Sequence, residues 1–516
     1  MLLVGMRLTR LFAIFFAFYS VLCSAQTAAR YTVSGTVLNS ATDEPIRRAL
    51  VAVGASFVFT GADGRFQVEG IPQGQIMIAA QKPGYFDCAN VFCSNGSPAR
   101  LIINVQSGAN EVVLKLVPES KIEGRVVDEE GEPIGDIQIQ IQGEHILNGQ
   151  KQFRPDGNAV TDENGTYRAE NLLPGTYTVR TMARPAFWSD PGTLSTAQVY
   201  PQRFFPNAPD AASAQQLNVK AGQVAIADFT LTSASAFRIT GTIAPAVPSL
   251  SLNVRDSDGA EMNAPLRFDP KSGKFSLSFV PAGIWNLEFT YNQADGHSLY
   301  AAQTVTVDSH DVKDLRIALQ PLPSVLVNVV NGPAQIQLES TDPRWEGGIF
   351  GGMDPPSTPD GPHVIIVPPG EYKVFVPAPG GNRCLVSLTS GNIDLTREDL
   401  IVASGSQPQP INAILQNDCA VLQVTVHEPN PNAQSTVLLI PASHAMQPVT
   451  AQLDPAGSYV FTDLSPGDYQ VYAFSSIDGL EYANPEVMRD YSGQQIALSP
   501  NQHANVTLDV IGRAAN

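Results

Sequence analysis

Positive charge is scarce in this sequence of 516 residues, which holds 31 Lys and Arg against 49 Asp and Glu, for a formal net charge of −18. A protein that binds nucleic acid needs clustered Lys and Arg to neutralise phosphates, so we expect no nucleic-acid partner. Charged residues of both signs make up only 16% of the chain, whereas 43% of it is hydrophobic. That balance excludes a disordered polyelectrolyte, which combines low hydrophobicity with many charges.

Residue patterns that mark catalytic or metal sites are also missing. The seven histidines begin no HxxE or HExxH pattern, which would bring zinc ligands together, and there is no GxSxG, Walker or GxGxxG motif. The acidic segments 162–165 and 256–261 space oxygen atoms roughly as a calcium loop does, but Asp and Gly are also ordinary turn residues. We therefore predict no enzyme activity, no cofactor and no metal site.

The N-terminus has the layout of a secretory signal peptide. Arg7 and Arg10 precede an apolar run over residues 11–23, and Ala25 offers a small residue at a cleavage point. The run has 13 residues, short of the roughly 20 that span a membrane. A lipoprotein signal at Cys23 is the alternative, but Leu22 stands where a small residue is expected. We predict removal of residues 1–25.

Export has consequences for charge and location. Loss of two arginines takes the formal net charge of the mature chain from −18 to −20. No later segment is apolar enough to span a membrane. The mature chain is therefore expected in the periplasm, at the cell surface or outside the cell, without an integral membrane segment.

Cysteine is rare, and four of the five cysteines remain after cleavage. An even number in an exported chain indicates two disulfides. Three connectivities are possible, and the local one pairs Cys88 with Cys93 and Cys384 with Cys419. A metal site at Cys88 and Cys93 is the alternative, which has no nearby His or Cys to complete it.

Proline and glycine are abundant, at 40 and 41 residues, and they mark a repeat. A turn, an alternating strand, a glycine turn and a second alternating strand recur five times. The second-turn glycines are 101, 108, 87 and 97 residues apart, at Gly74, Gly175, Gly283, Gly370 and Gly467. This period is too long for a solenoid and suits a β-sandwich of roughly 100 residues. We predict an all-β fold with about five tandem antiparallel β-sandwiches, transthyretin-like or Ig-like.

The repeat also places the domain boundaries. One short helix is predicted, where Asn484 caps a turn that begins with Pro485. After the signal peptide, the expected domains are residues 26–118, 119–233, 234–321, 322–418 and 419–516.

The repeated motifs resemble the carboxypeptidase regulatory-like domain. The resemblance rests on a glycine-bearing first strand, an acidic turn ending Pro-Ile, and the patterns D-x-x-G-x-[FY] and L-x-P-G-x-Y. It is good over residues 31–117 and 119–232, covers the second half of 421–511, and is degenerate over 239–320 and 325–418. It implies a transthyretin-like, carbohydrate-binding-like sandwich, and the whole chain resembles exported bacterial proteins that string such non-catalytic units together.

Aromatic residues suggest one candidate binding site. Sugar rings have apolar faces that stack on exposed aromatic side chains, and a Pro-rich insertion holds Trp188, Tyr200, Phe204 and Phe205. The alternative is that these rings are buried at strand ends, as we expect for Trp285. Two functions follow: a structural or interaction module that binds another envelope protein, or a carbohydrate-binding protein that captures polysaccharide.

Overall fold

A computed structural model describes residues 30–86, 100–108, 110–186, 197–257, 259, 261–293, 297–342, 349–350, 363–377, 379, 381–427, 435–454 and 456–512. Three predictions made above lie outside these residues: the signal peptide over residues 1–25, the pair Cys88 and Cys93, and the side chain of Trp188.

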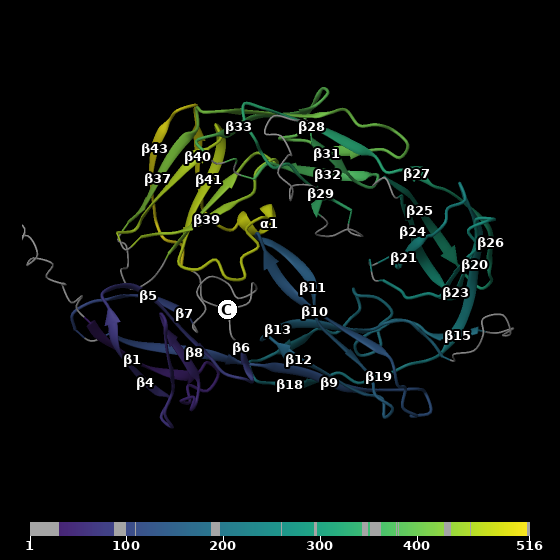
Figure 1. The fold of residues 1–516 in the computed structure, drawn as a ribbon, viewed down its shortest axis with the longest axis horizontal. Coiled ribbons are helices and arrows are strands. Elements are labelled where there is room, and N and C mark those ends of the chain that lie inside the picture. The colour runs from purple at the N-terminus through teal and green to yellow at the C-terminus, as the bar shows by residue number, and fades with distance from the viewer. Residues whose placement is uncertain are drawn as a thin grey trace, which may run out of the picture. The chain divides into compact units, whose positions relative to one another are not determined.

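The described strands form ten sheets, two for each of five tandem sandwiches (Figure 1). The predicted fold class is confirmed. The first sandwich, together with residues 119–121, 171–174 and 220–223, belongs to one compact unit of the chain, and the remainder of the other four sandwiches belongs to a second unit. No helix among the described residues is long and apolar enough to cross a membrane.

The strands of the first sandwich are β1(Arg30–Asn39), β2(Leu50–Val53), β3(Ser56–Phe59), β4(Arg65–Pro72), β5(Gly74–Gln81), β6(Tyr85–Phe86), β7(Arg100–Val105) and β8(Asn110–Pro118). Those of the second are β9(Ser120–Val127), β10(Gln138–Leu147), β11(Gln150–Val160), β12(Thr166–Leu172), β13(Gly175–Thr181), β16(Arg203–Phe204), β17(Leu217–Val219), β18(Val224–Ile226) and β19(Phe229–Thr230). The third has β14(Arg184–Pro185), β15(Ala197–Tyr200), β20(Ala234–Ala244), β21(Ser251–Arg255), β22(Leu266–Phe268), β23(Lys274–Pro281), β24(Gly283–Asn292), β25(Ser298–Val307), β26(Val312–Ala318) and β27(Gln320–Pro321).

The fourth sandwich has β28(Ser324–Val330), β29(Gln337–Ser340), β30(Ile349–Phe350), β31(His363–Ile366), β32(Gly370–Phe375), β33(Cys384–Ser390), β34(Ile393–Asp394), β35(Leu400–Val402) and β36(Ile411–Gln416). The fifth has β37(Ala420–Val426), β38(Thr436–Pro441), β39(Val449–Gln452), β40(Ser458–Leu464), β41(Gly467–Phe474), α1(Pro485–Met488), β42(Gln494–Leu498) and β43(His503–Leu508). The Asn484 side chain accepts a hydrogen bond from the Glu486 backbone N–H at the start of α1, as predicted.

Alternation along the strands builds a core between the two sheets of a sandwich. On β1, Val33 and Val37 point inward and are fully buried, while Ser34 and Thr36 between them are more exposed. They share one hydrophobic cluster with Val51 and Ile78 from the other sheet. Similar clusters fill the third, fourth and fifth sandwiches.

One strand pairing differs from an all-antiparallel sandwich. In each sandwich a late strand runs parallel to the first strand and beside it: β8 with β1, β19 with β9, β26 with β20, β36 with β28 and β43 with β37. In the first sandwich, the chain leaves the sheet that holds β7 and enters the sheet of β1 in the direction of β1. Alternation reports which face a side chain occupies but not which strand lies alongside, so the sequence could not show this pairing.

A glycine on the first strand permits this pairing in three sandwiches. A Cβ atom added to Gly35, Gly124 or Gly241 would lie 2.3, 2.1 or 2.3 Å from a carbonyl oxygen of the neighbouring chain segment. An aromatic ring covers each glycine, and the three rings belong to Phe66, Tyr167 and Phe275. The glycine of the sequence motif is therefore a place of close backbone approach.

Both repeated turns are stabilised by side-chain hydrogen bonds. In the first turn, an Asp carboxylate accepts a backbone N–H from two or four residues ahead, at Asp63, Asp162, Asp269 and Asp454. After the second turn, an aromatic side chain donates to the carbonyl four residues back. These bonds join Trp285 to Pro281, Tyr372 to Pro368 and Tyr469 to Ser465.

Part of the insertion expected in the second domain pairs with the third sandwich. Strand β15 is antiparallel to β20, with Ala197 opposite Ala236, and β14 extends the same sheet. Residues 184–185 and 197–200 thus contribute edge strands to a sheet that begins, by sequence, only at residue 234.

The predicted disulfide between Cys384 and Cys419 is present. Cys384 is buried at the start of β33, and Cys419 directly precedes β37. Next to it, the Leu385 backbone N–H donates to the Ser465 hydroxyl at 3.0 Å, which links the fourth and fifth sandwiches.

We expect Gly124→Ala to lower the free energy of unfolding of the second sandwich by about 1–3 kcal/mol, because the new methyl group meets a fixed carbonyl. Gly175→Ala is the matched control, since its added Cβ would have an ordinary contact of 3.7 Å with the Tyr177 ring. Hydrogen–deuterium exchange of residues 120–127 measures the effect. Equal exchange in the two variants would contradict the close approach.

The double variant Cys384→Ser/Cys419→Ser should unfold more easily by about 4 kcal/mol, since the bond closes a loop across a sequence separation of 35 residues. Calorimetry of the two proteins gives the difference. Peptide mapping without reductant should recover the two cysteines in one linked peptide, and separate peptides would refute the pairing.

Candidate functional site

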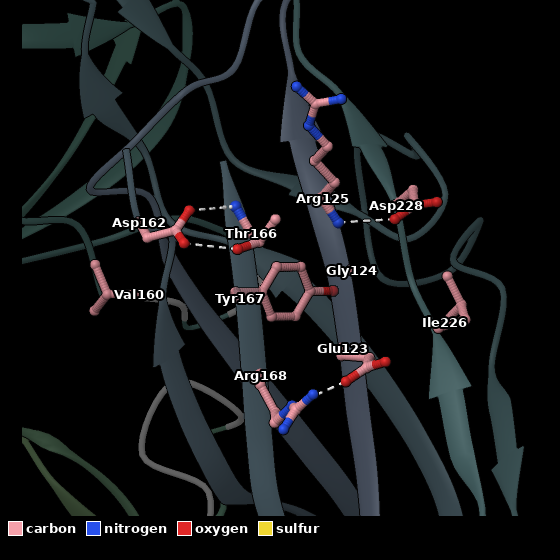
Figure 2. Close-up of a pocket in the computed structure, with 10 residues that line it drawn as sticks. All are labelled: Glu123, Gly124, Arg125, Val160, Asp162, Thr166, Tyr167, Arg168, Ile226 and Asp228. Carbon is pink, nitrogen blue, oxygen red and sulfur yellow. Dashed lines mark hydrogen bonds and ion pairs between the residues drawn. The ribbon is translucent and has the colours of Figure 1, made fainter. Parts of the chain in front are cut away.

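The outer face of one sheet of the second sandwich carries the candidate site. It is a hollow of about 550 Å³ over β12, β9 and β18, lined by Glu123, Gly124, Arg125, Val160, Asp162, Thr166, Tyr167, Arg168, Ile226 and Asp228 (Figure 2). Alternation along β9 places Glu123 and Arg125 on this face, because Ile122 and Val126 point into the core.

The charged side chains of the hollow are paired with one another or with the backbone. The Arg168 Nε lies 2.9 Å from Glu123 Oε2 across the two strands. The Arg125 backbone N–H donates to Asp228 Oδ1 at 2.7 Å, and its Nε donates to the Asn164 carbonyl at 3.1 Å. Figure 2 shows the Arg168 and Glu123 side chains pointing toward each other from neighbouring strands. The third sandwich has a contact of the same kind at a different position of its first strand, where the Arg238 N–H donates to Asp311 at 2.9 Å.

The Asp162 carboxylate accepts its hydrogen bonds from residues of its own turn. The donors are the Thr166 hydroxyl, the Thr166 N–H and the Asn164 N–H, at 2.8–2.9 Å. The Thr166 hydroxyl bond contributes most to holding the pKa of this carboxyl below its usual range. Gly165 completes the turn with a φ of 72°. The calcium-like spacing seen in the sequence is thus a hydrogen-bonded turn.

Tyr167 is a structural residue of the site. Its hydroxyl donates to the Ala227 carbonyl at 2.5 Å, and its ring lies over Gly124 (Figure 2). Burial raises the pKa of Tyr167 above its usual value, and the Asp228 carboxylate raises it further. A phenol with a raised pKa stays protonated at neutral pH. The Tyr167 hydroxyl is therefore a hydrogen-bond donor that fixes the chain segment between β18 and β19, and it does not act as a base.

Two acidic side chains of the second segment, residues 256–261, also have partners within the protein. Glu261 lies 2.8 Å from the Arg255 guanidinium, which also approaches the buried Glu288 at 3.4 Å. The Asp256 carboxylate accepts a hydrogen bond from Gln202. Among the residues that the structure describes, no group of three or more His, Cys, Asp and Glu side chains could hold a metal ion.

The predicted aromatic cluster does not form an exposed platform in its described part. Phe204 is 1% exposed, and the Arg180 guanidinium lies 5.9 Å from its ring centroid. Phe205 is half-buried and packs edge-to-face on Phe229, while Tyr200 is half-buried on β15. Phe204 is therefore a core residue, because its strand β16 pairs with β13 and turns that ring inward. Trp285 is a core residue, as predicted.

Our sequence reasoning missed the ion pair of Glu123 and Arg168 and the contact of Arg125 with Asp228. Alternation over residues 122–126 could have assigned the outward side chains to one face. The partners, Arg168 on β12 and Asp228, are 45 and 103 residues away, and no local pattern connects them.

Comparisons with known proteins agree with the local geometry. The family model of the carboxypeptidase regulatory-like domain matches residues 121–232, the segment that carries the hollow. No curated protein matches the chain.

Solved structures with some likeness include pilins of low identity. The minor pilin GBS52 of Streptococcus agalactiae is 12% identical, with 42% of this chain and 99% of the pilin covered and a TM-score of 0.22. A streptococcal ancillary pilin is 11% identical, with 57% and 100% covered and a TM-score of 0.20. The major pilin BcpA of Bacillus cereus is 10% identical, with 93% and 99% covered and a TM-score of 0.16.

TM-scores this low establish no common arrangement of the whole chains. The sequence motifs, the close approach at Gly124 and the family match all fall on the same sandwich. Residues 121–232 of this tandem β-sandwich protein therefore match the carboxypeptidase regulatory-like domain in both sequence and fold.

Proposed function

We propose that this chain is an exported, non-catalytic protein of the cell envelope, in which the sandwiches act as structural and interaction modules. One observation supports a binding role over a catalytic one: the charged groups of the candidate site hold strands and turns together. Arg125, Glu123 and Arg168 bind partners within the same sheet, and the exposed Val160 and Ile226 lie beside them.

The acidity of the carboxyl groups supports the same proposal. A general acid at neutral pH needs a raised pKa. Turn hydrogen bonds instead lower the pKa of four carboxyl groups, those of Asp162, Asp210, Asp269 and Asp394. Burial raises the pKa of Glu339, but this residue is paired across the strands with Lys373, which opposes the rise.

The export of the chain is inferred from residues 1–25. The kind of partner is inferred from the net charge of the chain and from the exposure of its aromatic side chains. A strongly negative mature chain stays soluble and is repelled by anionic surfaces. Polysaccharide capture by the cluster around Phe204 is not favoured, because that ring is buried and Tyr200 and Phe205 are half-buried.

Export is tested by expressing the full chain in a bacterial host and determining the N-terminus of the product. We expect the mature protein to begin at Gln26 in the envelope fraction or the medium. Phe15→Asp/Phe16→Asp interrupts the apolar run and should leave the precursor in the cytoplasm, whereas Cys23→Ser should be processed normally. An intact precursor from the native chain, or a lipid-modified Cys23, would overturn this part of the proposal.

The non-catalytic role is tested with peptide, ester and glycoside substrates, each with and without added Zn²⁺. We expect no turnover, because the Asp162 carboxylate is hydrogen-bonded within its own turn, which lowers its pKa, and Glu123 is paired with Arg168. Asp162→Asn and Asp269→Asn change the same turn in two different sandwiches. Turnover that disappears in Asp162→Asn and survives in Asp269→Asn would identify an active site and refute the proposal.

A further inference from the structure

The first sandwich presents an unusually exposed apolar face. Its sheet of β3, β2, β5 and β7 buries Val51, Val53 and Ile78 on the inner side. On the outer side, the side chains of Phe57, Phe59, Met77 and Ile102 are 68, 65, 55 and 73% exposed. Large apolar side chains gathered on one face mark binding surfaces more often than scattered ones do.

The strand register brings these side chains onto one surface. Phe57 is opposite Ala52, which is in turn opposite Ala79, so two small residues lie beside the first ring. Met77 is directly opposite Ile102. Phe57 and Phe59 are two residues apart on β3, so both rings project from one face about 7 Å apart.

Amide side chains border the apolar residues. Gln75 is opposite Asn104, next to the pair of Met77 and Ile102, and Gln81 is opposite Leu50, next to Phe59. All three amides are exposed. Among the residues of this face whose side chains the structure describes, none is charged; Arg100 begins β7 at the end of the face, opposite Ala79.

The size of the face disfavours a second copy as its occupant. Taking about 200 Å² for a large side chain, the exposed parts of the four side chains come to about 500 Å². A stable protein interface buries about 800 Å² on each partner. A second copy would also carry the same formal charge of −18, and like charges oppose association.

We propose that this face binds a neutral polysaccharide. Sugar rings offer apolar C–H faces to the phenylalanine rings and to Met77, and their hydroxyl groups pair with amides, which both donate and accept. A polymer of uncharged sugars fits a surface made mainly of apolar and amide side chains. The proposal names a ligand for the interaction module and rests on the proposed function only for the compartment where such polymers occur.

The test uses the purified mature chain, residues 26–516, with insoluble cellulose, chitin and starch as neutral polymers and cross-linked polygalacturonate as an acidic one. We expect retention on at least one neutral polymer and none on the acidic one. Retention should change little between low and high salt, because no ion pair forms. Absence of retention on every neutral polymer, or binding that falls steeply with salt, would overturn the proposal.

Two matched variants locate the site. Phe57→Ala/Phe59→Ala should weaken retention at least tenfold, whereas Val364→Ala/Ile366→Ala, which removes exposed apolar side chains on β31, should leave it unchanged. Because both phenylalanines are exposed, circular dichroism and thermal unfolding should match the native chain. If the phenylalanine variant nevertheless misfolds, Met77→Gln/Ile102→Gln decides in its place, and full retention by a folded variant refutes the site.

Sedimentation velocity tests whether a second copy of the chain occupies this face instead. A concentration-dependent dimer that Phe57→Asp disperses would assign the face to self-association and refute polysaccharide binding. Either result leaves the export and turnover tests unaffected, so failure here is separable from failure of the proposed function.

Discussion

The close approach of two strands across a glycine is the constraint on which the rest of the sandwich depends. At Gly35, Gly124 and Gly241, a neighbouring backbone carbonyl occupies the space of a Cβ atom, and an aromatic ring covers the gap. The contact joins the first strand to the parallel segment that closes its sheet, and it is buried against the core. In these three sandwiches an added Cβ atom would meet that carbonyl, so a side chain there would force the closing segment to shift. The glycine and the buried aromatic ring therefore occur together in these three sandwiches, whereas the parallel pairing is found in all five.

The fifth sandwich shows what the glycine does, because it lacks one. Val424 stands at the corresponding place, opposite Tyr459. Where glycine is present, the corresponding rings of Phe66, Tyr167 and Phe275 are 3–5% exposed, whereas Tyr459 is 38% exposed. The valine fills the space that the ring would take, so Tyr459 moves outward and packs edge-to-face on Phe461.

Sequence patterns predicted the features that short-range chemistry determines. Alternation indicated strands, Asp and Gly predicted the turn at Asp162, and Cys384 with Cys419 followed from an even count and short separation. The parallel closing strand and the pairing of β15 with β20 depend on partners far along the chain. The same limit applies to the binding surfaces. Phe204 and Phe57 both lie in short apolar segments, and only the strand register turns one ring into the core and the other outward.

The fourth sandwich departs furthest from the pattern, and a disulfide ties its strand β33 to Cys419, the residue before β37. Val327 replaces the glycine, and His363 is opposite it in place of an aromatic residue. The glycine contact and its buried ring are both absent there, and a ring of this kind contributes about 1.5–3 kcal/mol by burial. A disulfide closing a loop of 35 residues contributes about 4 kcal/mol. Cys384 lies on β33, which pairs with the closing strand β36. The covalent bond therefore acts on the same strand whose position the glycine contact secures in the first three sandwiches.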